Sequence, residues 1–525
     1  MKKTQVSPIY PFGKGLDKTS IPGAQDKRSL NKANNIILNN RGSLRKRPGA
    51  RRIDYIGDDS GNLQAAIQFF ATSGAGQKSE VIRVIGGRIE AIRDGQAVDL
   101  GIQVSDTDTI TFERFGNALI IHFENTRPKY YTIGGTLNDL EVLSGHEDSP
   151  PTFSRLHQFR LVYGGRPASP HDLYFSALND INDYSLANGG FSIRVNDGDG
   201  DVVGLTGLSP TFKGDLYAFK FNNIYRIFGS PTGYGVAQIT NEVGCVQHNT
   251  IIATQNDVFF VSPYAIHSLV NTDKYGSVES STVSYPIFEY FQDNVNWNAS
   301  KYMVATYDKP SNCYLLSFAS AGSAINDRVL GFNIRTGEFF EWESVYYPTI
   351  GKYFDLNRQK SLVGEKDMGL GVLDQDISTD FGKAINVEVT TGIIFPLNNP
   401  KTRCDFTKAW ILARPTNEST EFDVSYWVDG DLIETVKLDT SAPGAKFNDV
   451  QPAIIGQDYK IGSSLIGKDK TDLIVLEMEL TGNGNSIQFD FKHEPPEDDP
   501  DQSFELYGII FEFEYIEDKE SNTAI

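Results

Sequence analysis

The chain has 525 residues and a mass of 58.2 kDa, and its 68 acidic and 48 basic side chains give a formal charge of −20. This acidity excludes a surface that coats nucleic acid, which would have to be basic. Aromatic residues make up 12%, which excludes a chain disordered throughout. The length favours two to four domains, or one repeat-like body with appendages.

The cysteines and the hydropathy of the chain indicate where the protein is made and whether it crosses a membrane. Cys245, Cys313 and Cys404 lie far apart and form no CxxC pair, so we expect no disulfide scaffold and a protein made in the cytosol. The opening MKKTQVSPIYPFGKG has two lysines but no apolar stretch, so no signal peptide is predicted. No window approaches ~18 uninterrupted apolar residues, and we therefore expect no membrane span.

Residues 1–60 differ from the rest of the chain. Proline and glycine predict an extended or turning course, and RGSLRKRPGARR then places six basic residues within 41–52. This basic segment is either a solvated arm or loop neutralised by acidic neighbours, or an arm that docks on an acidic partner. Under the second interpretation, the candidate interface residues are Arg41, Arg45, Lys46, Arg47, Pro48, Gly49, Arg51 and Arg52.

From 61 to 380, strand-like runs alternate with tight polar turns. Gly86-Gly87 and Asn222-Asn223 suit two-residue hairpin loops, because both residue types tolerate positive φ. Hairpins that recur every ~40–50 residues are typical of propeller blades. The units predict a degenerate β-propeller of six or seven blades, near 63–93, 107–134, 152–178, 203–228, 247–270, 300–342 and 345–373.

Near residue 380 the pattern changes. Strictly alternating strands lie farther apart, with turns such as Asp429-Gly430 between them. This pattern predicts a β-sandwich-like domain over 381–525. The expected organisation is all-β: an extended docking segment (1–60), a propeller (61–380) and this C-terminal domain, with a short helix near 283–293.

The sequence lacks the common motifs for catalytic nucleophiles, catalytic zinc and phosphate binding. It has no GxSxG, no HExxH and no phosphate-binding glycine loop, so we expect no catalytic residues, no cofactor and no enzyme. Cys245 and His248 lie close in sequence, but an apolar strand follows them, which favours a packed cysteine and a turn histidine.

One acidic cluster, NDGDGD (196–201), resembles the first half of a calcium-binding loop. Its weak candidate ligands are Asp197, Asp199 and Asp201. The glycine expected next is Val202, and the closing glutamate position is Leu208. A polar turn between two strands is the simpler interpretation, and no metal is predicted.

Five segments form a pattern when they are taken in order. They are IPGAQDKRSLNKANNIILNNRGSLRKRPGARR near the start, HDLYFSALNDINDYS with the GDGD turn, GDLYAFKFNNIYRIFG, NDVFFVSPYAIHSL, and SFELYGIIFEFEYI at the end. Together they resemble the tail nozzle (tail hub) proteins of short-tailed bacteriophages. Each motif alone is only moderately specific. Residues 270–380 match little beyond blade-like hairpins.

This resemblance implies a virion structural protein made in the host cytoplasm. Six copies would form the distal ring that continues the DNA-ejection channel below the portal and adaptor and gates genome release. Implied partners are the other subunits, the adaptor ring and passing double-stranded DNA that is not bound specifically; tail fibres or a needle are further candidates. The basic segment would contact the adaptor or a neighbouring subunit.

Two alternatives remain at this stage. A receptor-binding propeller that binds or hydrolyses glycans would use aromatic residues near turns, namely Trp297, Tyr346, Tyr347 and Trp427. A cellular propeller that assembles protein partners is the other alternative, and the phage-like opening motif argues against it.

Overall fold

The computed structural model describes the whole chain except residues 1, 22–23, 40–41, 74–75, 144–145, 196–203, 231–232, 270–280, 344, 346, 348, 356–357, 366–367, 415–419, 441–444, 447–473 and 517–525. The chain forms two compact units. The propeller unit comprises residues 50–334 and 342–374, and the sandwich unit comprises residues 1–49, 335–341 and 375–525.

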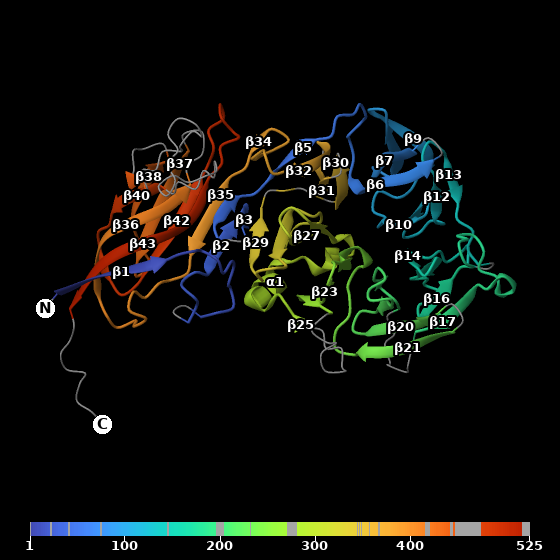
Figure 1. Ribbon diagram of the computed structural model, residues 1–525, viewed down its shortest axis with the longest axis horizontal. Helices are drawn as coiled ribbons and strands as arrows, with labels where there is room; N and C mark the ends of the chain where they lie inside the picture. The colour runs from blue at the N-terminus through green and yellow to red at the C-terminus, as the bar shows by residue number, and fades with distance from the viewer. Residues whose placement is uncertain are drawn as a thin grey trace, which may run out of the picture. The chain divides into compact units, whose positions relative to one another are not determined.

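Separate four-stranded antiparallel sheets follow one another along the propeller unit (Figure 1). In chain order they are β6 (Leu63–Ser73), β7 (Gly76–Ile85), β8 (Arg88–Arg93) and β9 (Gln96–Gln103); β10 (Thr111–Phe115), β11 (Ala118–His122), β12 (Lys129–Tyr131) and β13 (Leu137–Asp139); β14 (Phe153–His157), β15 (Arg160–Gly164), β16 (Asp172–Phe175) and β17 (Phe191–Arg194); β18 (Gly207–Leu208), β19 (Leu216–Phe219), β20 (Ile224–Ser230) and β21 (Gly233–Thr240); and β22 (Ile252–Ala253), β23 (Val258–Ser262), β24 (Ala265–Ser268) and β25 (Ser281–Thr282).

Two further antiparallel meanders continue the series. They contain β26 (Val304–Asp308), β27 (Cys313–Phe318) and β28 (Arg328–Asn333), then β30 (Thr349–Asp355), β31 (Arg358–Glu365) and β32 (Gly369–Asp374). Between them, β29 (Phe339–Trp342) begins in the sandwich unit and ends in the propeller unit. Helical segments are η1 (Leu186–Asn188), η2 (His248–Thr250), η4 (Tyr285–Ile287), α1 (Phe288–Asn294) and η5 (Trp297–Tyr302), so the helix expected near 283–293 is confirmed.

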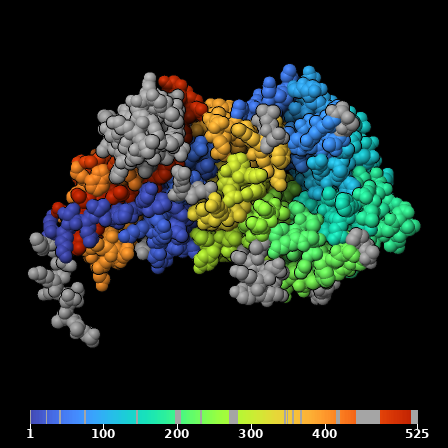
Figure 2. All heavy atoms as spheres, in the orientation of Figure 1, coloured from blue at the N-terminus to red at the C-terminus, as the bar shows by residue number. Residues whose placement is uncertain are grey.

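The meanders close into a ring. The first strands β6, β10 and β14 are neighbours in space, and β30 at the far end of the series contacts β6. Leu63 and Ile85 of the first sheet pack in one core with Leu362 and Leu370 of the last meander. The same chain order runs across the surface of this unit in Figure 2. This arrangement confirms the expected β-propeller of six or seven blades.

An early strand completes the last blade. β5 (Gly49–Arg52) lies beside β32, and the backbone N–H of Ile53 donates to the carbonyl of Leu370 at 2.9 Å. The last meander thus gains a fourth strand from the start of the chain. Because chain segments far apart in sequence share one sheet, the ring is held shut by backbone hydrogen bonds.

Two of the three predicted two-residue turns have the predicted form. Gly86 and Gly87 have φ of 53° and 75°, and Asp429 and Gly430 have φ of 51° and 92°, as tight hairpin loops require. The prediction for Asn222-Asn223 is wrong. Residues 220–223 form a four-residue loop between paired Phe219 and Ile224, which needs no positive φ at the asparagines.

The sandwich unit contains two antiparallel sheets (Figure 1). The first includes β1 (Lys2–Ile9), β3 (Ile36–Leu38), β4 (Leu44–Lys46), β36 (Cys404–Arg414), β39 (Ala445–Lys446), β40 (Ile474–Glu479), β41 (Asn483–Gly484) and β43 (Glu505–Ile516). The second includes β2 (Leu30–Asn34), β35 (Val387–Thr391), β37 (Glu421–Val428), β38 (Asp431–Asp439) and β42 (Ile487–His493). The short strands β33 (Thr379–Asp380) and β34 (Lys383–Ala384) pair with each other, and β33 lies next to β5 in sheet order.

Large aromatic side chains form the core between these sheets. Phe489 of β42 lies 5.9 Å, centroid to centroid, from Phe511 of β43, and Tyr426 of β37 accepts the backbone N–H of Thr481 at 3.0 Å. Alternation in β37, with Phe422, Val424, Tyr426 and Val428 buried, directs one face of the strand inward. The predicted sandwich is confirmed by this arrangement.

The predicted boundaries need correction. They were placed after residues 60 and 380, whereas the units divide after 49 and 374, and 335–341 belongs to the sandwich unit. Residues 2–9 are not a separate arm, because β1 pairs with β43 along its whole length, from Lys2 opposite Ile516 to Ile9 opposite Ile509. Strand pairing between the chain ends is a long-range effect that local composition does not reveal.

Candidate functional site

The first half of the basic segment is built into the sandwich unit. Lys46 and Arg47 are 1% and 2% exposed. The Lys46 ammonium donates to the carbonyl of Gln502 at 2.7 Å, and burial lowers its pKa to about 7. The guanidinium of Arg45 donates to the carbonyl of Gln375 at 2.8 Å.

The Arg47 side chain has several polar partners within this unit. Its guanidinium forms a two-pronged ion pair with the Asp380 carboxylate, one contact being 2.9 Å, and its Nε donates to Asn35 at 3.0 Å. Gly49 follows closely, and a Cβ there would lie 2.0 Å from the carbonyl oxygen of Thr379. Only glycine fits that approach, which gives the Pro48-Gly49 step a structural role.

The second half of the segment belongs to the propeller unit and is also paired. Arg51 forms an ion pair with Asp374, and Arg52 contacts Asp59 at 2.5 Å. Asp59 also binds Arg83, which is fully buried. Arg47, Arg51 and Arg52 are therefore neutralised by acidic residues of the same chain, whereas Arg45 and Lys46 donate to backbone carbonyls.

This result corrects the prediction of a docking arm. Lys46, Arg47, Pro48 and Gly49 are buried and cannot meet a partner where they lie. Arg51 and Arg52 are exposed, although both are ion-paired, and Arg41 lies outside the described residues. The weak calcium candidates Asp197, Asp199 and Asp201 also lie outside the described residues.

No cluster suited to a metal stands out in the described part of the chain, where no group of three or more His, Cys, Asp or Glu side chains is placed to hold an ion. Cys245 is fully buried, and His248 lies in η2, 1% exposed, with its Nδ1 accepting the backbone N–H of Leu208 at 3.1 Å. This confirms the packed cysteine and the turn histidine. Among the described helices, none is long and apolar enough to cross a membrane.

The aromatic residues considered for sugar stacking have different positions. Tyr347 is 1% exposed and unsuited to stacking, and Tyr346 lies outside the described residues. Trp297 is half-buried and meets the exposed Tyr264 edge to face, with ring centroids 5.1 Å apart. Trp427 is half-buried on β37 of the sandwich unit.

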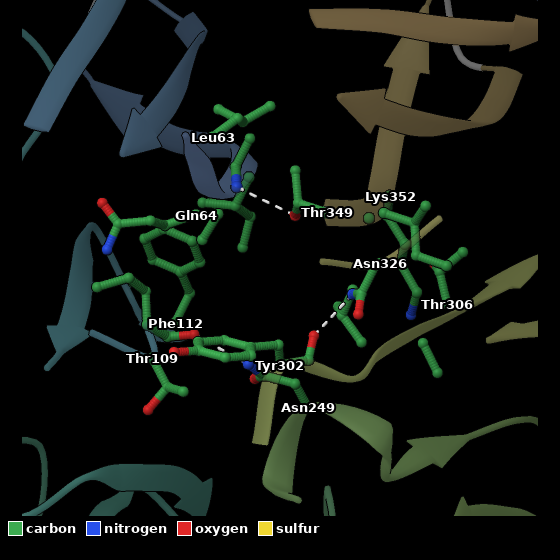
Figure 3. Close-up of a pocket in the computed structure, with 18 of the residues that line it drawn as sticks. Leu63, Gln64, Thr109, Phe112, Asn249, Tyr302, Thr306, Asn326, Thr349 and Lys352 are labelled. Atoms are coloured by element: carbon green, nitrogen blue, oxygen red, sulfur yellow. Dashed lines mark hydrogen bonds between the residues drawn. The ribbon is translucent and has the colours of Figure 1, made fainter. Parts of the chain in front are cut away.

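The propeller unit contains a central cavity of about 710 Å³ that the sequence did not predict. Its wall comes mainly from the first strands β6, β10, β22, β26 and β30, from the segments beside them and from η5, with single residues from β14 and η2 (Figure 3). Labelled wall residues are Leu63, Gln64, Thr109, Phe112, Asn249, Tyr302, Thr306, Asn326, Thr349 and Lys352. Hydrogen bonds connect different parts of the wall. The backbone N–H of Ala66 donates to the Thr349 hydroxyl at 3.3 Å, and the side-chain amide of Asn326 donates to the Tyr302 carbonyl at 2.8 Å.

Charged groups enter this cavity from separate blades. The Arg155 guanidinium of β14 contacts the Glu113 carboxylate of β10 at 2.9 Å. Lys352 of β30 reaches the same space with no ion-pair partner among the described residues. Desolvation in the cavity lowers the pKa of Lys352, and the positive charge of Arg155 adds to that effect.

A sequence signal for this wall existed. Glu113, Arg155 and Lys352 each interrupt the first apolar strand of a hairpin unit, in FERF, FSRLH and IGKYF. The blades of a propeller surround a central channel, and these three charged residues line the cavity. The degenerate repeats did not align well enough for these positions to be compared.

Comparison with known proteins gives a fold-level result. No family model matches the chain, and no curated protein does. Similar solved structures include the computationally designed Ika8 protein (14% identity, TM-score 0.36, 62% of this chain and 99% of that one). The WD40 β-propeller domain of Doa1 (9%, 0.39, 61% and 95%) and BamB from Moraxella catarrhalis (11%, 0.37, 68% and 96%) are also similar. At these values nothing about binding or assembly transfers to this chain.

Proposed function

We propose that this chain is a virion structural protein that forms the distal tail nozzle ring of a short-tailed bacteriophage. The observation that carries the proposal is the ordered resemblance of the opening, central and closing segments to that family. It implies a propeller with additional β-rich domains, and this chain has a propeller unit and a sandwich unit.

The segments that carry the resemblance form strands of both units. RGSLRKRPGARR supplies β4 and β5, GDLYAFKFNNIYRIFG supplies β19 and β20, and SFELYGIIFEFEYI supplies β43. β43 pairs with β1, β4 and β36, so the closing motif organises one sheet of the sandwich unit. In this proposal the motifs specify the fold of a subunit of the tail ring.

Charge supports a role beside passing DNA. Each chain carries −20, and six copies would carry 6 × −20 = −120. An acidic channel wall repels DNA and lets it slide without specific binding. In this proposal the adaptor ring and the neighbouring subunits are the partners.

The proposal is tested by locating the chain on particles. Gold-labelled antibody against the chain is expected at the distal tail, below the portal, in particles from the source lysate. An antibody against the major capsid protein is the matched control and should label the head. Intact particles that carry head label but no tail label would contradict the proposal.

A glycan-binding tail component is the second candidate, and the exposed Tyr264 edge against Trp297 favours it. Under this alternative, Tyr264→Ala removes binding on a glycan array, whereas Tyr285→Ala, at another exposed tyrosine, does not. An array with no hits for the intact chain would discard it.

A further inference from the structure

The central cavity of the propeller unit has two chemically different ends. β6 and β30 run side by side in the same direction, because Thr349 contacts Ala66 and, farther along, the Phe354 N–H donates to Gln68 at 2.6 Å. β6 and the segment leading into β10 also run together, since Gln64 donates to the carbonyl of Asp108. Residues late in these strands therefore share one end of the cavity.

Cations gather at that end. Lys352 is the middle residue of β30, and Arg114 is the fourth of the five residues of β10, whereas the wall acids Asp106 and Asp108 precede β10 at the other end. Glu113 is already paired with Arg155. Among the described residues, this part of the wall carries Lys352, Arg114 and Arg155 against Glu113, and Lys352 has no ion-pair partner.

Aromatic surface lies beside these cations. Phe70 and Phe354 meet edge to face with centroids 5.6 Å apart, and Phe354 is 42% exposed. Phe112 lines the wall as well, on the side opposite Lys352 in Figure 3. A cavity of about 710 Å³ lies within the range that holds small organic ligands, which bind through apolar walls and a few polar groups.

We propose that this end of the cavity binds a small organic anion. Lys352 contacts its carboxylate or phosphate, Arg155 adds positive charge, and Phe70, Phe112 and Phe354 contact its apolar or aromatic body. The site is independent of the proposed virion role and requires no covalent step. Lys352 is exposed to the solvent in the cavity, so its ammonium is accessible to an anion that enters there.

Isothermal titration of the full-length chain with phenyl phosphate tests the site. We expect saturable binding of one molecule per chain, and Lys352→Gln should weaken it about tenfold or more, as expected for loss of a charged hydrogen bond. Lys352→Arg should retain the affinity within about threefold, since the charge remains. The matched control Lys309→Gln removes an exposed lysine outside the cavity wall and should leave the affinity unchanged.

Inorganic phosphate and phenol test separately the contact with the anionic group and the contact with the aromatic body of the ligand. Both should bind at least about tenfold more weakly than phenyl phosphate, because each lacks one half of the ligand. Inorganic phosphate with equal affinity would overturn the aromatic contact, and phenol with equal affinity would overturn the role of the anion. No saturable phenyl phosphate binding up to about 10 mM, or equal affinity in Lys352→Gln, would overturn the site.

Discussion

Arg47 shows why a basic residue in an acidic chain need not point outward. Its charge is compensated by Asp380, and its remaining donors reach Asn35 and the Pro48 carbonyl. A buried ion pair adds little net stability compared with apolar packing, but removing one partner leaves an uncompensated buried charge. The pair therefore makes the local fold depend on both residues.

Replacement of Asp380 by Asn tests this dependence. We expect the free energy of unfolding of the sandwich unit to fall by about 3–5 kcal/mol, because the Arg47 charge stays buried without its partner. The measurement is urea unfolding followed by circular dichroism. The control Asp26→Asn breaks a surface pair with Arg28, 2.9 Å long, and should cost at most about 1 kcal/mol. Equal small losses in both variants would contradict a buried, essential pair.

His122 makes stability depend on pH. It is fully buried; its Nδ1 lies 2.9 Å from the Pro151 carbonyl, to which it donates, and its Nε2 accepts the Ser154 hydroxyl at 2.8 Å. Burial lowers its pKa from 6.5 to about 4. The unfolded chain therefore takes up this proton first, and stability is lost as the pH falls from 6.5 towards 4.

The expected contribution of His122 is up to about 3 kcal/mol over that window, at about 1.4 kcal/mol per pH unit. Urea unfolding at a series of pH values should show a shallower pH dependence in His122→Asn than in the original chain. Identical slopes between pH 6.5 and 4 would show that His122 is protonated equally in both states.

At the scale of elements, β1 protects the edge of β43. It covers residues 509–516 of that strand, and β4 pairs with it at Leu506 and Glu505. An uncovered edge would present unpaired backbone groups to other chains. We expect deletion of residues 1–9 to cause concentration-dependent aggregation, measured by light scattering. The control variant Lys2→Ala, which removes only the exposed ion pairs with Asp405 and Glu514, should stay monodisperse. A deletion variant that also stays monodisperse would show that β1 is not needed to protect this edge.

Elements were predicted well where the signal is local. The Gly86-Gly87 and Asp429-Gly430 turns and the alternating strands after 380 follow from φ preference and side-chain alternation. The pairing of β1 with β43 and the placement of β5 beside β32 were missed, since both join residues hundreds of positions apart. For the same reason the acidic partners of Arg47 and Arg51 were not foreseen.

At the scale of the whole molecule, pairing of β5 with β32 closes the propeller unit, and several blades together build the wall of its cavity. Neither blade spacing nor composition alone indicates the cavity, because its residues come from the first strands of several blades and from the segments that connect them. The propeller as a fold was predictable from the recurring hairpins.

The central claim is that six copies of this chain form the distal tail ring. Electron cryomicroscopy of intact particles, with six-fold averaging of the tail, tests it most directly. We expect six densities below the adaptor, each of which accommodates the propeller unit and the sandwich unit fitted as separate bodies, around a channel continuous with the portal. A distal ring that accommodates neither unit, or particles that lack this chain, would contradict the claim.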